Sequence, residues 1–319
     1  MLSIRFFKLF IILAISTIMI LPEAAFSQIY KISGGPSGGT FQYYAQAIQN
    51  LAKNSDLKIL AMSSNGSIEN IRLVNSGLSG FGIAYSAHVY SAKEGKLKND
   101  KSKYGDVMAV AYLYGAPAQL IVKKKAGITH PKELMDKRVG VGNEGSGAAE
   151  NAELYFSALG IWDKMGRENL GYLEADEAFV NGQLDAFWVF AGFPNASVSD
   201  AASKTDIMLL NTYEAGDEAG LFKKYPYFTK VVIPADTYQG QSEDVITFQD
   251  TAILVVNKKV SDDDVYKLLL NIFTKEGLEY MVKAHVSATA MSTENGIKGI
   301  VTPLHPGAKK FWKEKGVLK

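Results

Sequence analysis

Apolar and polar residues alternate along the chain in a pattern that predicts short strands followed by helices. The clearest case begins at Ile29, where a β-prone run reaches Ile32 and then meets a loop rich in glycine and serine. From Phe41 to Ala52 the apolar residues recur three and four positions apart, so one face of the predicted helix is apolar. This stretch is therefore a strand, a Gly/Ser loop and a helix.

Two later stretches repeat this order. A predicted strand at Leu57–Met62 leads through Ser63–Ser67 into a helix, for which Ser67 or Asn65 is the expected N-cap. Another at Arg138–Val141 leads through Gly142–Gly147 into a third helix. Ligands bind at the carboxyl ends of strands in open α/β sheets, where helix N-termini present free N–H groups. The three loops together predict a binding cleft between two α/β lobes.

The remaining pattern sets the expected lobe boundaries. The apolar run Val107–Tyr114 predicts a buried strand that ends in a turn at Gly115–Pro117, and Thr251–Val256 predicts another buried strand. We expect the chain to pass between lobes near Leu113–Pro117 and Val245–Thr251, where apolar strands meet turn residues. Lobe 1 then comprises residues 29–117 plus 246–319, and lobe 2 comprises residues 118–245.

Three shorter predictions complete the pattern. Leu170–Leu173 is expected to be a strand, and Thr129 is expected to cap a short helix that begins near Pro131. Residues 223–250 are rich in Tyr, Pro and Gly and show no clear period. Strands that alternate with helices indicate parallel or mixed sheets flanked by helices.

The first 27 residues have the pattern of a signal peptide. Arg5 and Lys8 precede the apolar run Leu9–Leu21, and small residues follow it at Ala25 and Ser27. Such a run is short for a membrane span, which needs roughly 20 apolar residues. We therefore expect cleavage before Gln28 and a periplasmic protein; an uncleaved anchor is the alternative.

Composition narrows the class of protein. The chain has 319 residues, enough for about two domains, and no cysteine, which excludes disulfides, thiol catalysis and Cys-bound zinc. Residues 1–27 hold Arg5, Lys8 and Glu23 among the 34 basic and 33 acidic residues, so the remainder is formally neutral. The sequence shows no basic patch interleaved with aromatics, which is the pattern typical of nucleic-acid binding. We expect a monomer.

The sequence offers little for an enzyme. Its four histidines show no metal-binding spacing, and no GxSxG nucleophile motif is present. Gly140–Gly145 reads GxGxxG, but a dinucleotide site also needs an acidic residue at the end of the next strand, roughly 20 residues on. The nearest candidate, Glu174, comes about ten residues late. We expect neither a cofactor nor a metal.

The candidate binding groups are neutral. After residue 27 the only arginines are Arg72, Arg138 and Arg167, and none lies in a Gly/Ser loop. An acidic ligand would therefore be held by backbone N–H groups, hydroxyls and amides rather than by an arginine clamp. Tyr85 and Phe190 lie at predicted strand ends, where either could close over a ligand.

Six segments in order resemble the TAXI family, the solute receptors of TRAP-type secondary transporters. The match covers nearly the whole chain after residue 27, and its segments are GGPSGGTFQYY (34–44), SSNGSIENI (63–71), ITHPKELMDKRVGVGNEGSG (128–147), GQLDAFWVFAGFP (182–194), KYPYFTKVVIPADTYQGQSEDV (224–245) and LHPGAKKFWKEKG (304–316). The resemblance implies a type II periplasmic binding protein fold, with a small organic acid (a dicarboxylate or an acidic amino acid) held between two lobes. It also implies delivery of that acid to the membrane permease subunits of a TRAP transporter.

The resemblance also implies a set of binding residues. Together with Tyr85 and Phe190, the ligand-binding residues are expected to be Ser37, Gly38, Gly39, Thr40, Tyr43, Ser64, Asn65, Gly66, Ser67, Asn70, Gly145, Ser146, Gly147, Ala191, Gly192 and Pro194. The chain departs from the family at Gly80, Tyr85 and Ala87, where Asp, Gln and Asp are usual. We therefore expect a ligand with a larger or more apolar portion than glutamate, or one without a cationic amine. A receptor of this fold that serves an ABC importer or a sensor kinase, and an enzyme on this fold, remain alternatives.

Overall fold

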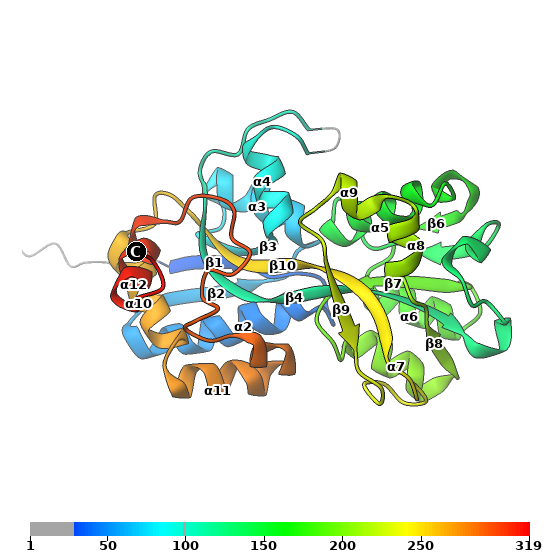
Figure 1. The fold of residues 1–319 in the computed structure, drawn as a ribbon. Coiled ribbons are helices and arrows are strands. Elements are labelled where there is room, and N and C mark those ends of the chain that lie inside the picture. Colours follow the sequence, from blue (N-terminus) through cyan, green and yellow to red (C-terminus); the bar gives the residue numbers. More distant parts are fainter. Residues whose placement is uncertain (1–28, 98–99) are drawn as a thin grey trace, which may run out of the picture.

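Two α/β lobes lie side by side in the computed structural model, which describes residues 29–97 and 100–319 (Figure 1). The predicted signal peptide lies outside the described residues. The strands are β1 Ile29–Ser33, β2 Lys58–Met62, β3 Phe81–Tyr85, β4 Val107–Lys123, β5 Arg138–Gly140, β6 Gly166–Glu168, β7 Ala186–Phe190, β8 Ile207–Leu209, β9 Thr229–Ile233 and β10 Val245–Asn257. The helices are α2 Thr40–Ala52, α3 Ser67–Ser76, α4 Ser86–Lys93, α5 Gly147–Ala158, α6 Tyr172–Val180, α7 Ala196–Lys204, α8 Tyr213–Glu218, α9 Leu221–Lys224, α10 Asp262–Ile272, α11 Lys275–Ala284 and α12 Pro306–Glu314.

One mixed sheet runs through both lobes, in the order β2-β1-β3-β10-β4-β7-β5-β6. β1 pairs in parallel with β2 and β3, and β5 pairs in parallel with β6 and β7. β10 and β4 lie between these groups and pair antiparallel with their neighbours. The predicted α/β fold with two lobes is confirmed, and so are all three strand–loop–helix units.

β4 and β10 connect the lobes. Residues 107–117 of β4 pair with β10, and residues 118–123 pair with β7 and β8. The predicted turn at Gly115–Pro117 is therefore wrong, because this stretch lies inside one continuous 17-residue strand. The end of the Gln249 side chain of β10 lies over Gly115, since a Cβ atom there would lie 2.0 Å from it.

Three local predictions are also wrong. The strand expected at 170–173 lies at β6 instead, and Tyr172 begins α6. His130, not Thr129, caps the turn at Pro131, because its ring accepts a hydrogen bond from the Lys132 N–H. The N-cap of α3 is Gly66, whose φ of 112° suits glycine, and no side chain caps it in the described structure.

The C-terminal helices return to the first lobe. Trp312 of α12 is fully buried, and its indole N–H donates to the Val110 carbonyl of β4 at 2.8 Å. Gly296 packs against the same indole, since a Cβ atom there would lie 2.1 Å from the ring. Asn50 of α2 likewise donates to the Tyr280 hydroxyl of α11 at 3.0 Å. These contacts hold α11 and α12 on the lobe that contains β1 and β2 (Figure 1).

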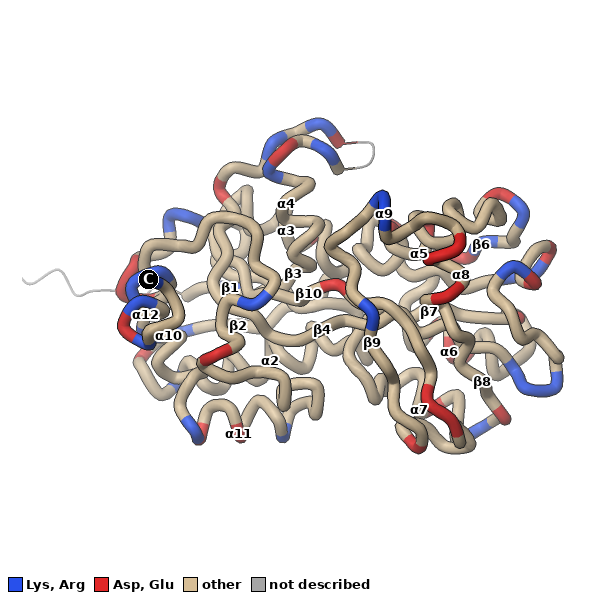
Figure 2. Tube along the Cα trace, in the orientation of Figure 1, with Lys and Arg blue, Asp and Glu red and all other residues tan. Residues whose placement is uncertain are grey.

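Charged residues of both signs are scattered over the outer helices and loops of both lobes of the described chain (Figure 2). Within residues 29–97 and 100–319, no helix has the length and apolarity that crossing a bilayer requires.

Candidate functional site

The three Gly/Ser loops meet at a cavity between the lobes. About 370 Å³ of space there is not filled by protein atoms, which includes space open to solvent. The residues that line it are Pro36, Gly39, Thr40, Phe41, Asn65, Gly66, Ser67, Tyr85, Tyr114, Asn143, Ser146, Gly147, Ala148, Tyr172, Phe190 and Ala191.

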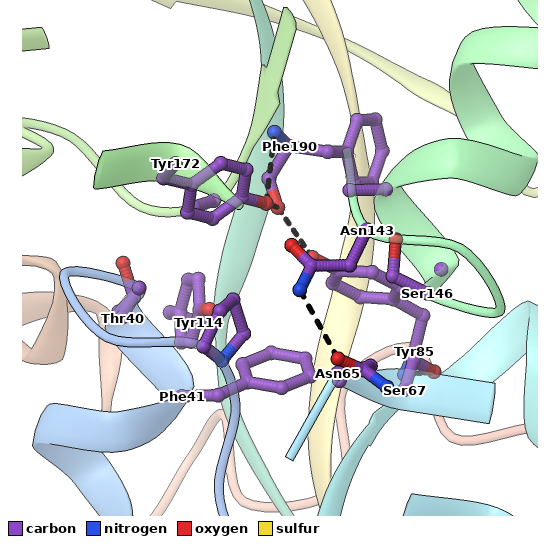
Figure 3. Close-up of a pocket in the computed structure, with 16 residues that line it drawn as sticks. Thr40, Phe41, Asn65, Ser67, Tyr85, Tyr114, Asn143, Ser146, Tyr172 and Phe190 are labelled. Carbon is purple, nitrogen blue, oxygen red and sulfur yellow. Dashed lines mark hydrogen bonds between the residues drawn. The ribbon is translucent and has the colours of Figure 1, made fainter. Parts of the chain in front are cut away.

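Aromatic rings form the apolar walls of this cavity (Figure 3). The Tyr85 ring lies 5.0 Å from Phe41 and 5.2 Å from Phe190, measured between ring centroids. The hydroxyls of Tyr85 and Tyr172 both donate to the Phe190 carbonyl, the latter at 3.0 Å. The Tyr172 hydroxyl also accepts from the Phe190 N–H at 3.3 Å. These bonds fix the rings in this structure, and the one from Tyr85 to Phe190 joins the two lobes.

Helix N-termini supply the polar part of the site. α2, α3 and α5 begin at Thr40, Ser67 and Gly147, and all three of these residues line the cavity. In the described structure α2 and α3 have no side-chain cap, so their first N–H groups are available to a ligand. Ser146 caps α5 by accepting from the Ala149 N–H at 3.0 Å.

The lining residues carry no formal charge. Burial raises the pKa of Tyr85, Tyr114 and Tyr172, so these hydroxyls stay protonated at ordinary pH. The Tyr114 hydroxyl is buried and has no hydrogen bond of good geometry within the described residues, although Thr40 lies near it. A ligand in this cavity would therefore meet backbone and side-chain dipoles but no charged side chain. Glu150 and Glu69 stand in the first turns of α5 and α3 and weaken the attraction of an anion to these helix ends.

Hydrogen bonds between the lobes close the cavity. The Asn143 amide donates to the Asn65 side chain at 3.1 Å, as Figure 3 shows, and the Asn195 amide donates to the Gly38 carbonyl at 3.3 Å. His285 Nε2 lies 3.1 Å from the Pro194 carbonyl. The structure is thus a closed form, in which residues of both lobes enclose the space.

Ten of the predicted binding residues line this cavity. They come from all three loops, from β3 and from the end of β7, and they are Gly39, Thr40, Asn65, Gly66, Ser67, Tyr85, Ser146, Gly147, Phe190 and Ala191. Their role in binding stays a prediction.

Eight predicted residues do not line the cavity, namely Ser37, Gly38, Tyr43, Ser64, Asn70, Gly145, Gly192 and Pro194. Asn70 is fully buried and supports the loops instead, since its amide donates to the Gly34 and Ile83 carbonyls and its oxygen accepts from Ser64. Ser37 and Gly145 are exposed to solvent.

Four other members of this group lie at or beside contacts between the lobes. Tyr43 packs near His285, with ring centroids 5.9 Å apart, and Pro194 is hydrogen-bonded to the same histidine. Gly192 lies against Ser287, whose Oγ would be 2.9 Å from a Cβ atom at this position. The Gly38 carbonyl accepts from Asn195 across the lobes.

Sequence reasoning missed six lining residues: Pro36, Phe41, Tyr114, Asn143, Ala148 and Tyr172. Asn143 belongs to the third Gly/Ser loop, so its place in that loop was the available signal. Tyr114 ends the apolar run of β4, where an aromatic residue is equally consistent with core packing. Tyr172 carried no signal, because its helix was expected to start later.

The departures at 80, 85 and 87 lie in different environments. Gly80 precedes β3 at the end away from the cavity, and a Cβ atom there would lie 2.7 Å from the Tyr30 ring. Ala87 is buried in α4 and is not a lining residue. Of the three positions, only Tyr85 can touch a ligand in the cavity. Among the described residues, no group of three or more acidic or histidine side chains could hold a metal ion.

Solved structures share the fold at low sequence identity. The structure of MatC from Rhodopseudomonas palustris with bound malate matches with a TM-score of 0.58 and 14% identity, over 91% of this chain and 99% of that one. A periplasmic transporter matches with a TM-score of 0.54 and 14% identity, over 90% and 92%. The alkanesulfonate-binding protein SsuA from Xanthomonas axonopodis pv. citri, bound to MOPS, matches with a TM-score of 0.50 and 13% identity, over 92% and 94%.

These likenesses establish a fold of the periplasmic binding protein type, with two lobes. The family is established by a sequence comparison, because the model of the NMT1-like family matches residues 32–316. That match spans most of the sequence and includes all three loops at the cavity. The chain belongs to the NMT1-like family.

Proposed function

We propose that this protein is a periplasmic solute receptor of the TAXI type. It traps a small organic acid between its lobes and delivers it to the membrane permease of a TRAP transporter. The part of the proposal that concerns the permease rests on the six sequence segments that resemble the TAXI family. Export rests on the signal-peptide pattern of residues 1–27.

The observation that carries the proposal is the convergence of three helix N-termini on one uncharged cavity between the lobes. α2 and α3 come from one lobe and α5 from the other, so a ligand held by all three joins the lobes. Backbone N–H groups at helix ends bind carboxylates. Inside a closed site such bonds are stronger than in water, because the effective dielectric constant is lower. MatC, which has a similar fold, holds malate, which agrees with an acid as the ligand.

The cavity walls refine the ligand class. Phe41, Tyr85 and Phe190 offer an apolar surface, and no lining carboxylate could pair with a cationic amine. A ligand with a carboxylate at the helix ends and an apolar portion on the rings suits these walls. This agrees with the expectation drawn from Tyr85 in the sequence.

Binding is coupled to movement about the two strands that join the lobes. We place the boundaries at 117/118 in β4 and 245/246 in β10, so that lobe 1 is 29–117 plus 246–319 and lobe 2 is 118–245. Closure excludes water and makes the cross-lobe bonds, such as Asn143 to Asn65. The permease then recognises the closed form.

A thermal-shift screen tests this proposal. Protein purified from the periplasm of an expression host is denatured and refolded to remove any bound molecule. It is then heated with dicarboxylates, 2-oxo and 2-hydroxy acids, amino acids, aromatic acids, sugars and NAD. A ligand at 100 times its Kd adds about 2.7 kcal/mol of stability, which moves Tm by a few degrees. A shift with one class of organic acid is expected, whereas a shift with sugars or NAD alone would refute the proposal.

A further inference from the structure

The Ser67 hydroxyl at the cavity wall is held by two groups that come from other elements. Ser67 is 1% exposed, and its Oγ accepts a hydrogen bond from the Tyr85 N–H at 2.9 Å. The same Oγ lies 3.1 Å from Nδ1 of His88 in α4. His88 is 4% exposed and does not line the cavity. Its ring can therefore affect a ligand only through the lining residues that it contacts, which are Ser67 through this pair of atoms, Tyr85 through an edge contact at 5.5 Å between ring centroids, and Gly147.

Glu150 faces the opposite side of the His88 ring. Its Oε2 lies 3.9 Å from His88 Nε2, and its side chain is mostly buried. The carboxylate belongs to α5, whereas Ser67 and His88 belong to α3 and α4. Gly147 permits this approach, because a Cβ atom there would lie 2.6 Å from the His88 ring. The arrangement is thus complete only when the lobes are closed.

The two neighbours decide where the protons lie. A carboxylate attracts an N–H group, so Glu150 favours the tautomer that carries its proton on Nε2. Burial lowers the pKa of His88, so the ring is neutral and Nδ1 keeps a lone pair. Nδ1 then accepts a hydrogen bond from the Ser67 hydroxyl, which keeps its proton. With its proton directed at His88 and one lone pair directed at the Tyr85 N–H, the Ser67 oxygen has one lone pair left.

We propose that His88 and Glu150 are positioning residues that make Ser67 a hydrogen-bond acceptor toward the solute. The solute is then an acid that carries a hydroxyl or similar donor beside its carboxylate. This inference rests on the proposed function and narrows its ligand class. A 2-oxo acid presents a carbonyl oxygen where a 2-hydroxy acid presents an O–H. When the Ser67 oxygen is an acceptor, the carbonyl oxygen of a 2-oxo acid cannot form a hydrogen bond with it. A buried oxygen is then left unpaired.

The test compares acids that differ only at carbon 2. Calorimetry measures Kd for lactate and pyruvate, for 2-hydroxyglutarate and 2-oxoglutarate, and for phenyllactate and phenylpyruvate. The proteins are the wild type, Glu150→Ala, His88→Leu and the control Glu144→Ala. Glu144 is an exposed carboxylate in the loop before α5, so its removal matches the charge change of Glu150→Ala. Glu150→Ala also serves as the variant that keeps the His88 packing intact.

We expect the wild type to bind the hydroxy acid of at least one pair about tenfold tighter than its oxo partner. In Glu150→Ala and His88→Leu the Ser67 hydroxyl is free to donate, so the preference falls to about threefold or less. Glu144→Ala keeps the wild-type preference. A purely structural role would weaken both acids equally and leave their ratio unchanged, and that result overturns the inference. Equal binding of hydroxy and oxo acids by the wild type also overturns it while leaving the receptor proposal intact; binding of no acid defeats both.

Discussion

Asp250 is a carboxyl group buried where β10 passes between the lobes. It is 3% exposed, and its Oδ1 accepts from the Thr251 N–H at 2.6 Å. Its Oδ2 has no hydrogen-bond partner among the described residues. Burial is the main reason that the pKa of this carboxyl rises from 3.8 to about 7, although the backbone N–H groups of Thr251 and Ala87 oppose the rise. The charged form of Asp250 should therefore destabilise the fold.

The size and sign of this effect follow from the two pKa values. The folded pKa lies above the unfolded one, so the folded state is favoured below pH 4 and loses stability as the pH rises toward 7. Each pKa unit corresponds to about 1.4 kcal/mol, so the full difference corresponds to about 4 kcal/mol. The Asp250→Asn change removes the charge and keeps the shape. We expect a gain of about 2 kcal/mol at pH 8, because the new amide is itself left partly unpaired.

Urea unfolding followed by tryptophan fluorescence measures this gain. The free energies of unfolding of the wild type and of Asp250→Asn are compared at pH 4, 6 and 8, with Asp217→Asn as an exposed control. All other carboxyl groups are common to the proteins and cancel. The difference should be near zero at pH 4 and should grow to pH 8, whereas the control should stay near zero throughout. A difference independent of pH, or a loss of stability at pH 8, would refute the reasoning.

Three further predictions concern the cavity and its supports. Gly147→Ala places a methyl group against His88, so closure is impeded and the affinity for the preferred acid should fall at least about tenfold by calorimetry, with unchanged far-UV circular dichroism. Asn70→Ala removes three hydrogen bonds, two of them buried, and should lower the free energy of unfolding by roughly 2–4 kcal/mol, as urea titration would show; a loss below 1 kcal/mol would contradict that role. Tyr85→Gln removes a ring from the cavity wall and should change the ranking of acids in a thermal-shift panel, so an unchanged ranking would count against selection by this residue.

The sequence predicted those features that depend on local pattern. Glycine and serine between an apolar strand and an amphipathic helix indicate the same unit wherever they occur, so all three loops were found. The turn predicted at Gly115–Pro117 shows the limit. Glycine and proline usually mark a turn, but here the glycine lies under the Gln249 side chain of a strand more than 130 residues away. No local pattern contains that contact.

The candidate site was likewise predicted only where it depends on local pattern. Residues in the loops, such as Ser67 and Ser146, were found because helix N-termini bind anions wherever they gather. Tyr172 was missed because it reaches the cavity from α6, whose packing on β7 only the tertiary structure shows. The sequence predicts Asn70 as a ligand residue because its segment resembles a binding motif. Its amide is instead occupied by two backbone carbonyls.

The most direct measurement for the receptor proposal is a calorimetric titration with the acid that gives the largest thermal shift. The wild type is compared with Ser146→Ala and Ser37→Ala, the same change inside and outside the cavity. One acid should bind per protein. Its affinity should be at least about fivefold weaker in Ser146→Ala, because this variant loses the cap that holds the start of α5. The affinity should be unchanged in Ser37→Ala. Equal affinity in all three proteins would place the acid outside this cavity and contradict the account.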